Sequence, residues 1–110
     1  MYSGLSLLVS TATEGSRCAA LATFAGLELL EAADLGRRAT DFGDGLLSPV
    51  GRETFARSLV ELRDTALTLE TIDFFACAAT SETMLVETSL PVLSTPRFLR
   101  ETQGARLIFV

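Results

Sequence analysis

Cys77 is the residue of this chain whose type and position best fit chemistry. It ends the apolar run Ile72–Cys77, and a more polar stretch follows it. In an open α/β sheet the ligand crevice lies outside the carboxyl ends of the strands, so we expect the thiol to face a crevice. Backbone N–H groups of a following helix would favour its thiolate, the nucleophilic form. Residue type alone favours the alternative of a small buried side chain, and position shifts the balance towards chemistry.

The composition of the chain offers few other residues that could act as catalytic groups. The chain has no His, and its 9 basic residues are all Arg. A Ser-His-Asp or Cys-His hydrolase within one chain is therefore excluded, as are Schiff-base chemistry and a phosphate-binding lysine. A zinc site would need cysteines and carboxylates alone, and the two cysteines are far apart in sequence. We therefore expect neither a metal nor a cofactor.

Four other side chains are weaker candidates. Cys18 reads best as a small buried residue, since two thiols in a cytoplasmic domain are more often free than bridged. Asp44, in a Gly-Asp-Gly turn, could act as a base at the sheet mouth, although a carboxylate that caps its own turn is favoured. Glu82 could open the helix after Cys77, and Arg97 could pair with a thiolate or an anionic substrate. Solvated surface positions are favoured for both.

Length and charge narrow the class of protein. A chain of 110 residues is predicted to form a single domain, 1–110. Its net charge of −5 argues against nucleic acid and anionic membranes as partners. No apolar run approaches the roughly 18 residues that cross a bilayer, and no signal peptide is visible, so we expect a soluble cytoplasmic protein. A hydrophobic fraction of 48% is high for a small domain and indicates apolar surface buried between subunits.

Apolar periodicity and turn residues predict alternating strands and helices. Strands are expected at 5–10, 38–42, 72–77, 90–93 and 106–110. Helices are expected at 18–33, 52–69, within 80–88, and at 96–102 with Thr95 as its cap. This alternation predicts a three-layer α/β/α fold with a mainly parallel sheet of about five strands.

Four segments, in this order and spacing, carry a resemblance to a known family. They are the strand, loop and Ala-rich helix of 5–33, the strand and turn of 41–47, the strand and loop of 72–80 around Cys77, and the closing helix and strand of 100–109. Together they resemble the DsrE/DsrF-like sulfur-relay proteins, the group that includes the TusD-type subunits. The resemblance implies a DsrE-like fold over nearly the whole chain.

The resemblance also implies a function. Cys77 would accept persulfide sulfur from a protein donor and pass it to a protein acceptor, as a sulfurtransferase or sulfur carrier. Relatives assemble as dimers, trimers or hexamers, so a homo-oligomer is expected. Persulfide transfer needs a thiolate and a good leaving sulfur, not an acid/base pair, and so requires no His. The alternative is a non-catalytic oligomeric binding or regulatory module with Cys77 as a structural residue.

Overall fold

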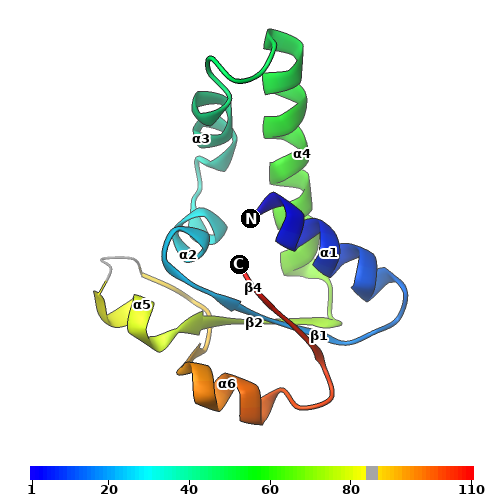
Figure 1. The fold of residues 1–110 in the computed structure, drawn as a ribbon, viewed down its shortest axis with the longest axis vertical. Helices are drawn as coiled ribbons and strands as arrows, with labels where there is room; N and C mark the ends of the chain where they lie inside the picture. The colour runs from blue at the N-terminus through cyan, green and yellow to red at the C-terminus, as the bar shows by residue number, and fades with distance from the viewer. Residues whose placement is uncertain (84–86) are drawn as a thin grey trace.

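A computed structural model of the protein, which describes residues 1–83 and 87–110, is a mixed α/β domain with a four-stranded parallel sheet (Figure 1). Within those residues there are six helices: α1 (Tyr2–Thr13), α2 (Phe24–Glu31), α3 (Leu35–Phe42), α4 (Pro49–Thr68), α5 (Ala78–Thr83) and α6 (Thr95–Glu101). The strands are β1 (Cys18–Ala22), β2 (Ile72–Cys77), β3 (Val92–Leu93) and β4 (Arg106–Phe109). Their order across the sheet is β3-β2-β1-β4.

Strand β1 lies inside the sheet and sets its register. Its first residue, Cys18, lies opposite Ile72 of β2 on one side and Arg106 of β4 on the other. All five residues of β1 are buried, as expected of a parallel strand with helices on both faces. The short edge strand β3 pairs only with the carboxyl end of β2, so that Leu93 lies opposite Cys77.

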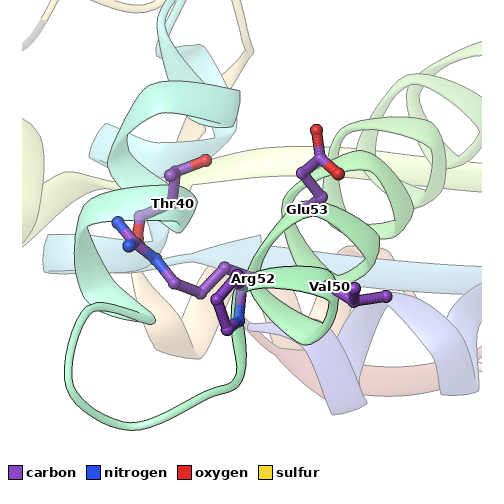
Figure 2. A pocket seen from close by; sticks show the side chains of 5 residues that line it. Thr40, Val50, Arg52 and Glu53 are labelled. Carbon is purple, nitrogen blue, oxygen red and sulfur yellow. The ribbon is translucent and has the colours of Figure 1, made fainter.

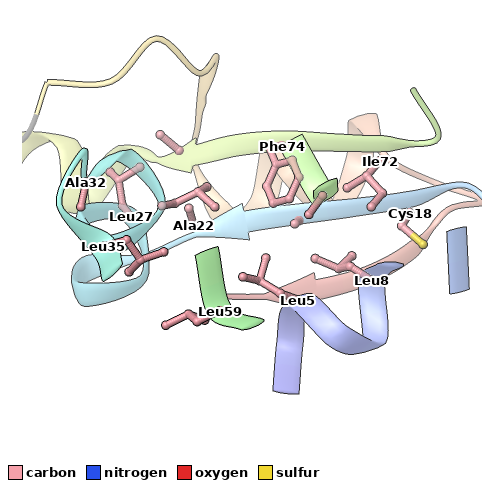
Figure 3. Packing of buried hydrophobic residues seen from close by; sticks show 14 of the residues in the cluster. Leu5, Leu8, Cys18, Ala22, Leu27, Ala32, Leu35, Leu59, Ile72 and Phe74 are labelled. Carbon is pink, nitrogen blue, oxygen red and sulfur yellow. The ribbon is translucent and has the colours of Figure 1, made fainter. Parts of the chain in front are cut away.

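Helices cover both faces of this sheet. On one face, Leu5 and Leu8 of α1 and Leu59 of α4 pack with Phe74 and other side chains of the sheet (Figure 3). On the other face, Phe98 of α6 is the central side chain of a smaller cluster that is completed by Ala19, Leu21, Cys77 and Leu93. This arrangement is compatible with the predicted three layers.

The elements with strong local signals are confirmed. The helix predicted at 52–69 is α4, which begins earlier because Ser48 caps it and accepts a hydrogen bond from the Gly51 amide at 3.0 Å. The strands at 72–77, 90–93 and 106–110 correspond to β2, β3 and β4, and the helix at 96–102 is α6. Its cap is Ser94, not Thr95 as predicted. The helix predicted within 80–88 is α5, which starts at Ala78, and residues 84–86 lie outside the described part.

The predicted strand at 5–10 is wrong, since this segment belongs to α1. Its buried residues are Leu5, Leu8 and Ala12, at the spacing of one helix face. The start of the predicted helix 18–33 is also wrong, because Cys18–Ala22 is β1 and only the second part is helical. Alanine favours helices when isolated, but five small or apolar buried residues also suit the middle of a parallel sheet, and tertiary packing decides.

The predicted strand at 38–42 is helical as well, within α3. Arg38 donates a hydrogen bond to Asp34 at 2.9 Å, four residues earlier, and also contacts Glu28 at 2.7 Å. The side-chain hydrogen bond from Arg37, together with the charges of both arginines, lowers the pKa of the Asp34 carboxyl. These corrections reduce the expected five strands to four across the described residues.

A close backbone approach ties the end of the chain to α2. The carbonyl of Val110 accepts hydrogen bonds from the amide and the hydroxyl of Thr23, at 3.0 and 3.2 Å. A Cβ atom at Gly26 would lie 2.3 Å from the Val110 carbonyl group, much closer than atoms can approach. Glycine at position 26 therefore allows the chain beyond β4 to lie against the first turn of α2.

Candidate functional site

Cys77 is the last residue of β2, at the carboxyl edge of the sheet as predicted. Its thiol is free, and its side chain lies on the face covered by α6. The residue is 7% exposed, because Leu93 and Phe98 belong to the apolar cluster that surrounds it. The position of Cys77 at a strand end agrees with the hypothesis of a reactive thiol. Its burial agrees with the alternative of a small core residue.

Helix α5 follows Cys77 without an intervening loop and is fastened to the end of β1. The fully buried hydroxyl of Thr80 accepts a hydrogen bond from the backbone amide of Phe24 at 3.0 Å. Phe24 has φ = 44°, a left-handed conformation that costs a non-glycine residue about 1–2 kcal/mol. The Thr80 contact stabilises this conformation, so the carboxyl ends of β1 and β2 meet beside Cys77. The Ser81 hydroxyl is buried here with no hydrogen-bond partner among the described residues.

The predicted charged partners of the thiol do not lie against it. Arg97 donates hydrogen bonds to Glu101 on the same helix, at 2.6 and 3.2 Å. Glu82 is exposed on α5. The structure therefore does not bring Arg97 or Glu82 to the thiol. The cluster that surrounds Cys77 is apolar and uncharged.

Cys18 occupies the opposite end of the sheet and the opposite face. It is buried in the larger cluster, with its sulfur 3.8 Å from the Ser16 carbonyl oxygen. Burial raises the pKa of its thiol, and the charge of Arg106 opposes that shift only in part. It lies opposite Ile72, five residues before Cys77, which separates the two cysteines by about 16 Å along the strands. The expectation that both thiols are free is met, because a disulfide between them would require a large rearrangement.

Asp44 lies far from Cys77, in the loop that joins α3 and α4 (Figure 1). Its carboxylate lies 3.5 Å from the Arg52 guanidinium, which also donates a hydrogen bond to the Thr40 carbonyl at 3.1 Å. Figure 2 shows Arg52 reaching from α4 towards Thr40, beside a shallow pocket of about 350 Å³ that Val50 and Glu53 also line. Arg52 thus fastens the loop between the helices, and the prediction of Asp44 at the sheet mouth is wrong.

An apolar cavity of about 590 Å³, which the sequence did not indicate, lies between α1, α2, α3 and α4. The ring of Phe55 is 5.8 Å from that of Tyr2 and 6.2 Å from that of Phe42, centroid to centroid, and all three line the cavity. Its size and apolar walls are those of a small-molecule site. Arg38 supplies one charge at the wall, already bonded to Glu28 and Asp34. The strands predicted at 5–10 and 38–42 would not bring these aromatic residues together, whereas the observed helices α1 and α3 do.

Across 1–83 and 87–110, no group of three or more cysteines and carboxylates is placed to hold a metal ion. No helix in the same residues is both long enough and apolar enough to cross a membrane.

Comparison with protein-family models, curated proteins and solved structures found no match to this chain.

Proposed function

We propose that the protein is a sulfur-relay protein in which Cys77 accepts persulfide sulfur and passes it on. One observation carries the proposal: Cys77 ends β2 at the carboxyl edge of a parallel sheet, where ligand crevices form. The other thiol, Cys18, is a poorer nucleophile because burial raises its pKa and keeps it protonated. The chain has no His or Lys, and this reaction requires neither.

The proposed step is a thiol exchange. The Cys77 thiolate attacks the terminal sulfur of a persulfide on the donor protein, forming a new S–S bond on Cys77. The S–S bond of the donor breaks, and its electron pair leaves with the donor's cysteine as a thiolate. An acceptor thiolate then repeats the attack on the Cys77 persulfide. No net oxidation occurs, so no redox cofactor is required.

Transfer requires that the sulfur of Cys77 be reached. With 7% of the residue exposed, the apolar cover that includes Leu93 and Phe98 has to give way when a donor docks. The edge strand β3 has only two residues, and α6 only seven, so this cover consists of short elements that open locally at low cost.

Membership of the DsrE/DsrF-like family is part of the proposal, supported by two of the four resembling segments. The segment 72–80 contains the predicted strand, β2, although helix α5 takes the place of the loop after it, and the segment 100–109 contains the end of α6 and strand β4. The segments 5–33 and 41–47 do not fold as the resemblance implies, because 5–10 and 38–42 are helical. We further propose protein donors and acceptors, a cytoplasmic location, where thiols remain reduced, and self-association of the chain.

A second function is favoured by a separate observation. In it the protein is a non-catalytic oligomeric binding module, Cys77 is part of the core, and the 590 Å³ apolar cavity between α1 and α4 holds the ligand. Burial of Cys77 in an apolar cluster is the observation that supports a structural role for it in this second function.

Sulfur uptake distinguishes the two. After incubation with a cysteine desulfurase and cysteine, mass spectrometry should show added sulfur on Cys77 in the native protein. The Cys18→Ala variant, a matched control, should take up as much as the wild type, and Cys77→Ser should take up none. Equal uptake by Cys77→Ser would rule out the relay. Native alkylation of Cys77 as slow as that of Cys18, together with no uptake, would instead support the binding module.

A further inference from the structure

We propose that the open edge of β4 pairs with the same edge of a second copy, in antiparallel orientation, so that the two sheets become continuous. This builds on the self-association proposed above and identifies its surface. It does not depend on the role of Cys77, which lies at the other side of the sheet, beside β3.

The backbone of β4 leaves half of its polar groups free at this edge. The amide of Arg106 donates to the carbonyl of Arg17, just before β1, at 3.0 Å, and the amide of Val110 donates to the carbonyl of Leu21 in β1 at 3.1 Å. Alternation along a strand then directs the N–H and C=O groups of Leu107 and Phe109 away from β1, to the side where the described chain supplies no strand. An edge with free donors and acceptors is a template for pairing with another strand.

The side chains of the same two residues are apolar and exposed. Leu107 is 42% exposed and Phe109 is 57% exposed, on the face covered by α6, where the Phe109 ring lies 6.0 Å from that of Phe98. Charged residues and prolines are the usual protection of an edge strand, and between Leu107 and Val110 this edge has neither.

These features select one register. If a twofold axis normal to the sheet passes between the two copies of Ile108, Leu107 lies opposite Phe109 of the second copy. Each such pair exchanges both N–H···O bonds, because both residues direct their backbone groups outwards. Their side chains lie on the same face, so the two exposed apolar pairs cover each other.

Charge favours the same register. Arg106 is the only charged residue of β4. With the axis at Ile108, the two Arg106 residues are about 14 Å apart along the strands, beyond the screening length at moderate ionic strength. With the axis at Leu107 they would be only about 7 Å apart, and the like charges would repel.

Helix α1 adds surface on the other face of the sheet. Leu7, which is 58% exposed, lines a groove of about 320 Å³ beside Arg106, Leu107 and Ile108. In the pair, the two α1 helices would flank the twofold axis and cover Leu7. A four-residue strand with one helix face covers less than the roughly 800 Å² per partner of a standard interface, so we expect a micromolar dimer.

Amide hydrogen exchange on the wild-type protein, followed by NMR across the micromolar range, tests the edge without any substitution. Exchange at Leu107 and Phe109 should become at least about tenfold slower in concentrated than in dilute protein. The amide of Arg106, hydrogen-bonded to the carbonyl of Arg17, should be protected at both concentrations.

Sedimentation velocity of two variants gives the second test. Leu107→Lys puts a charge on the edge and should weaken dimerisation at least about tenfold. Leu46→Lys, the matched control, makes the same change of charge at a 70% exposed leucine of the α3–α4 loop, and should dimerise as the wild type does.

The outcomes of these experiments distinguish the proposed β4 surface from self-association in general. A dimer that resists Leu107→Lys and leaves the Leu107 and Phe109 amides unprotected would overturn this surface while self-association stands. A wild-type monomer at every concentration would overturn both. If Leu107→Lys does not fold, the wild-type exchange data decide alone.

Discussion

Replacing Phe98 with alanine tests the packing that covers Cys77. Phe98 is fully buried, and its ring centroid lies 5.9 Å from that of Phe75, edge-on, and 6.0 Å from that of Phe109. It is the only α6 residue among the buried members of the cluster that holds Cys77 and Leu93. Its removal should therefore weaken the protein and uncover the thiol together.

The expected loss of stability is large. Truncating a buried Phe to Ala costs about 3–5 kcal/mol, which includes the lost ring contacts and the cavity left behind. A domain of this size is stable by about 5–15 kcal/mol in total, so the variant would remain folded with a much reduced margin. Each kcal/mol corresponds to about 4 °C in the melting temperature, which predicts a decrease of roughly 12–20 °C.

Urea unfolding and native alkylation measure the two effects. In a Cys18→Ala background, iodoacetamide should label Cys77 faster in Phe98→Ala than in the parent. Leu99→Ala is the matched control, because Leu99 is the next residue of α6 and is 47% exposed, so it should cost less than about 1 kcal/mol. If Phe98→Ala unfolds at the same urea concentration as Leu99→Ala, the described packing of α6 is wrong.

Substitutions at four further positions test other contacts. Thr80→Val removes the acceptor for the first amide of α2 and should cost about 1–3 kcal/mol in urea unfolding, whereas Thr80→Ser should cost clearly less. Arg63→Met removes the donor to two carbonyls at the end of α2 and should cost a similar amount, so an unchanged melting temperature would contradict those bonds. Gly26→Ala should cost about 1–3 kcal/mol or more, because its Cβ would overlap the Val110 carbonyl, and a neutral result would refute the close approach. The arginines of α3 lower the pKa of the Asp34 carboxyl, so its stabilising effect is present at neutral pH and lost as pH falls through that pKa. The melting temperature of Asp34→Asn should thus lie below that of the wild type at neutral pH and converge with it in acid, and a constant difference would contradict the pairing.

Local signals predicted the second half of the fold better than the first. The apolar periodicity of 52–69 and the aromatic and β-branched residues of β2 each specify one structure within a short window, although the prediction missed the start of α4 at Pro49 with its cap Ser48. In contrast, the runs at 5–10 and 18–22 suit either a strand or a helix, because every residue is apolar or small. Which of them enters the sheet depends on partners far along the chain, in β2 and β4.

The candidate site around Cys77 could likewise be predicted only in part. That Cys77 ends a strand could be predicted, since the apolar run stops there. Residue type alone favoured its burial, but the side chains that cover it could not be predicted, because Leu93 and Phe98 pack on it only after β3 and α6 are in place. The side chain of Arg63 is nearly buried and donates to the end of α2, a contact between distant segments that periodicity does not reveal.

The position of β1 inside the sheet has a consequence for synthesis. β1 is the first strand to leave the ribosome, yet one of its two neighbours is β4, the last of the described strands to be made. At roughly 5–20 residues per second, the nascent chain spends seconds with that side of β1 open. Alanine-rich and uncharged, β1 is then the segment most exposed to wrong pairing. A chain stalled before Arg106 should therefore aggregate or engage chaperones, and synthesis of β4 covers that side of β1.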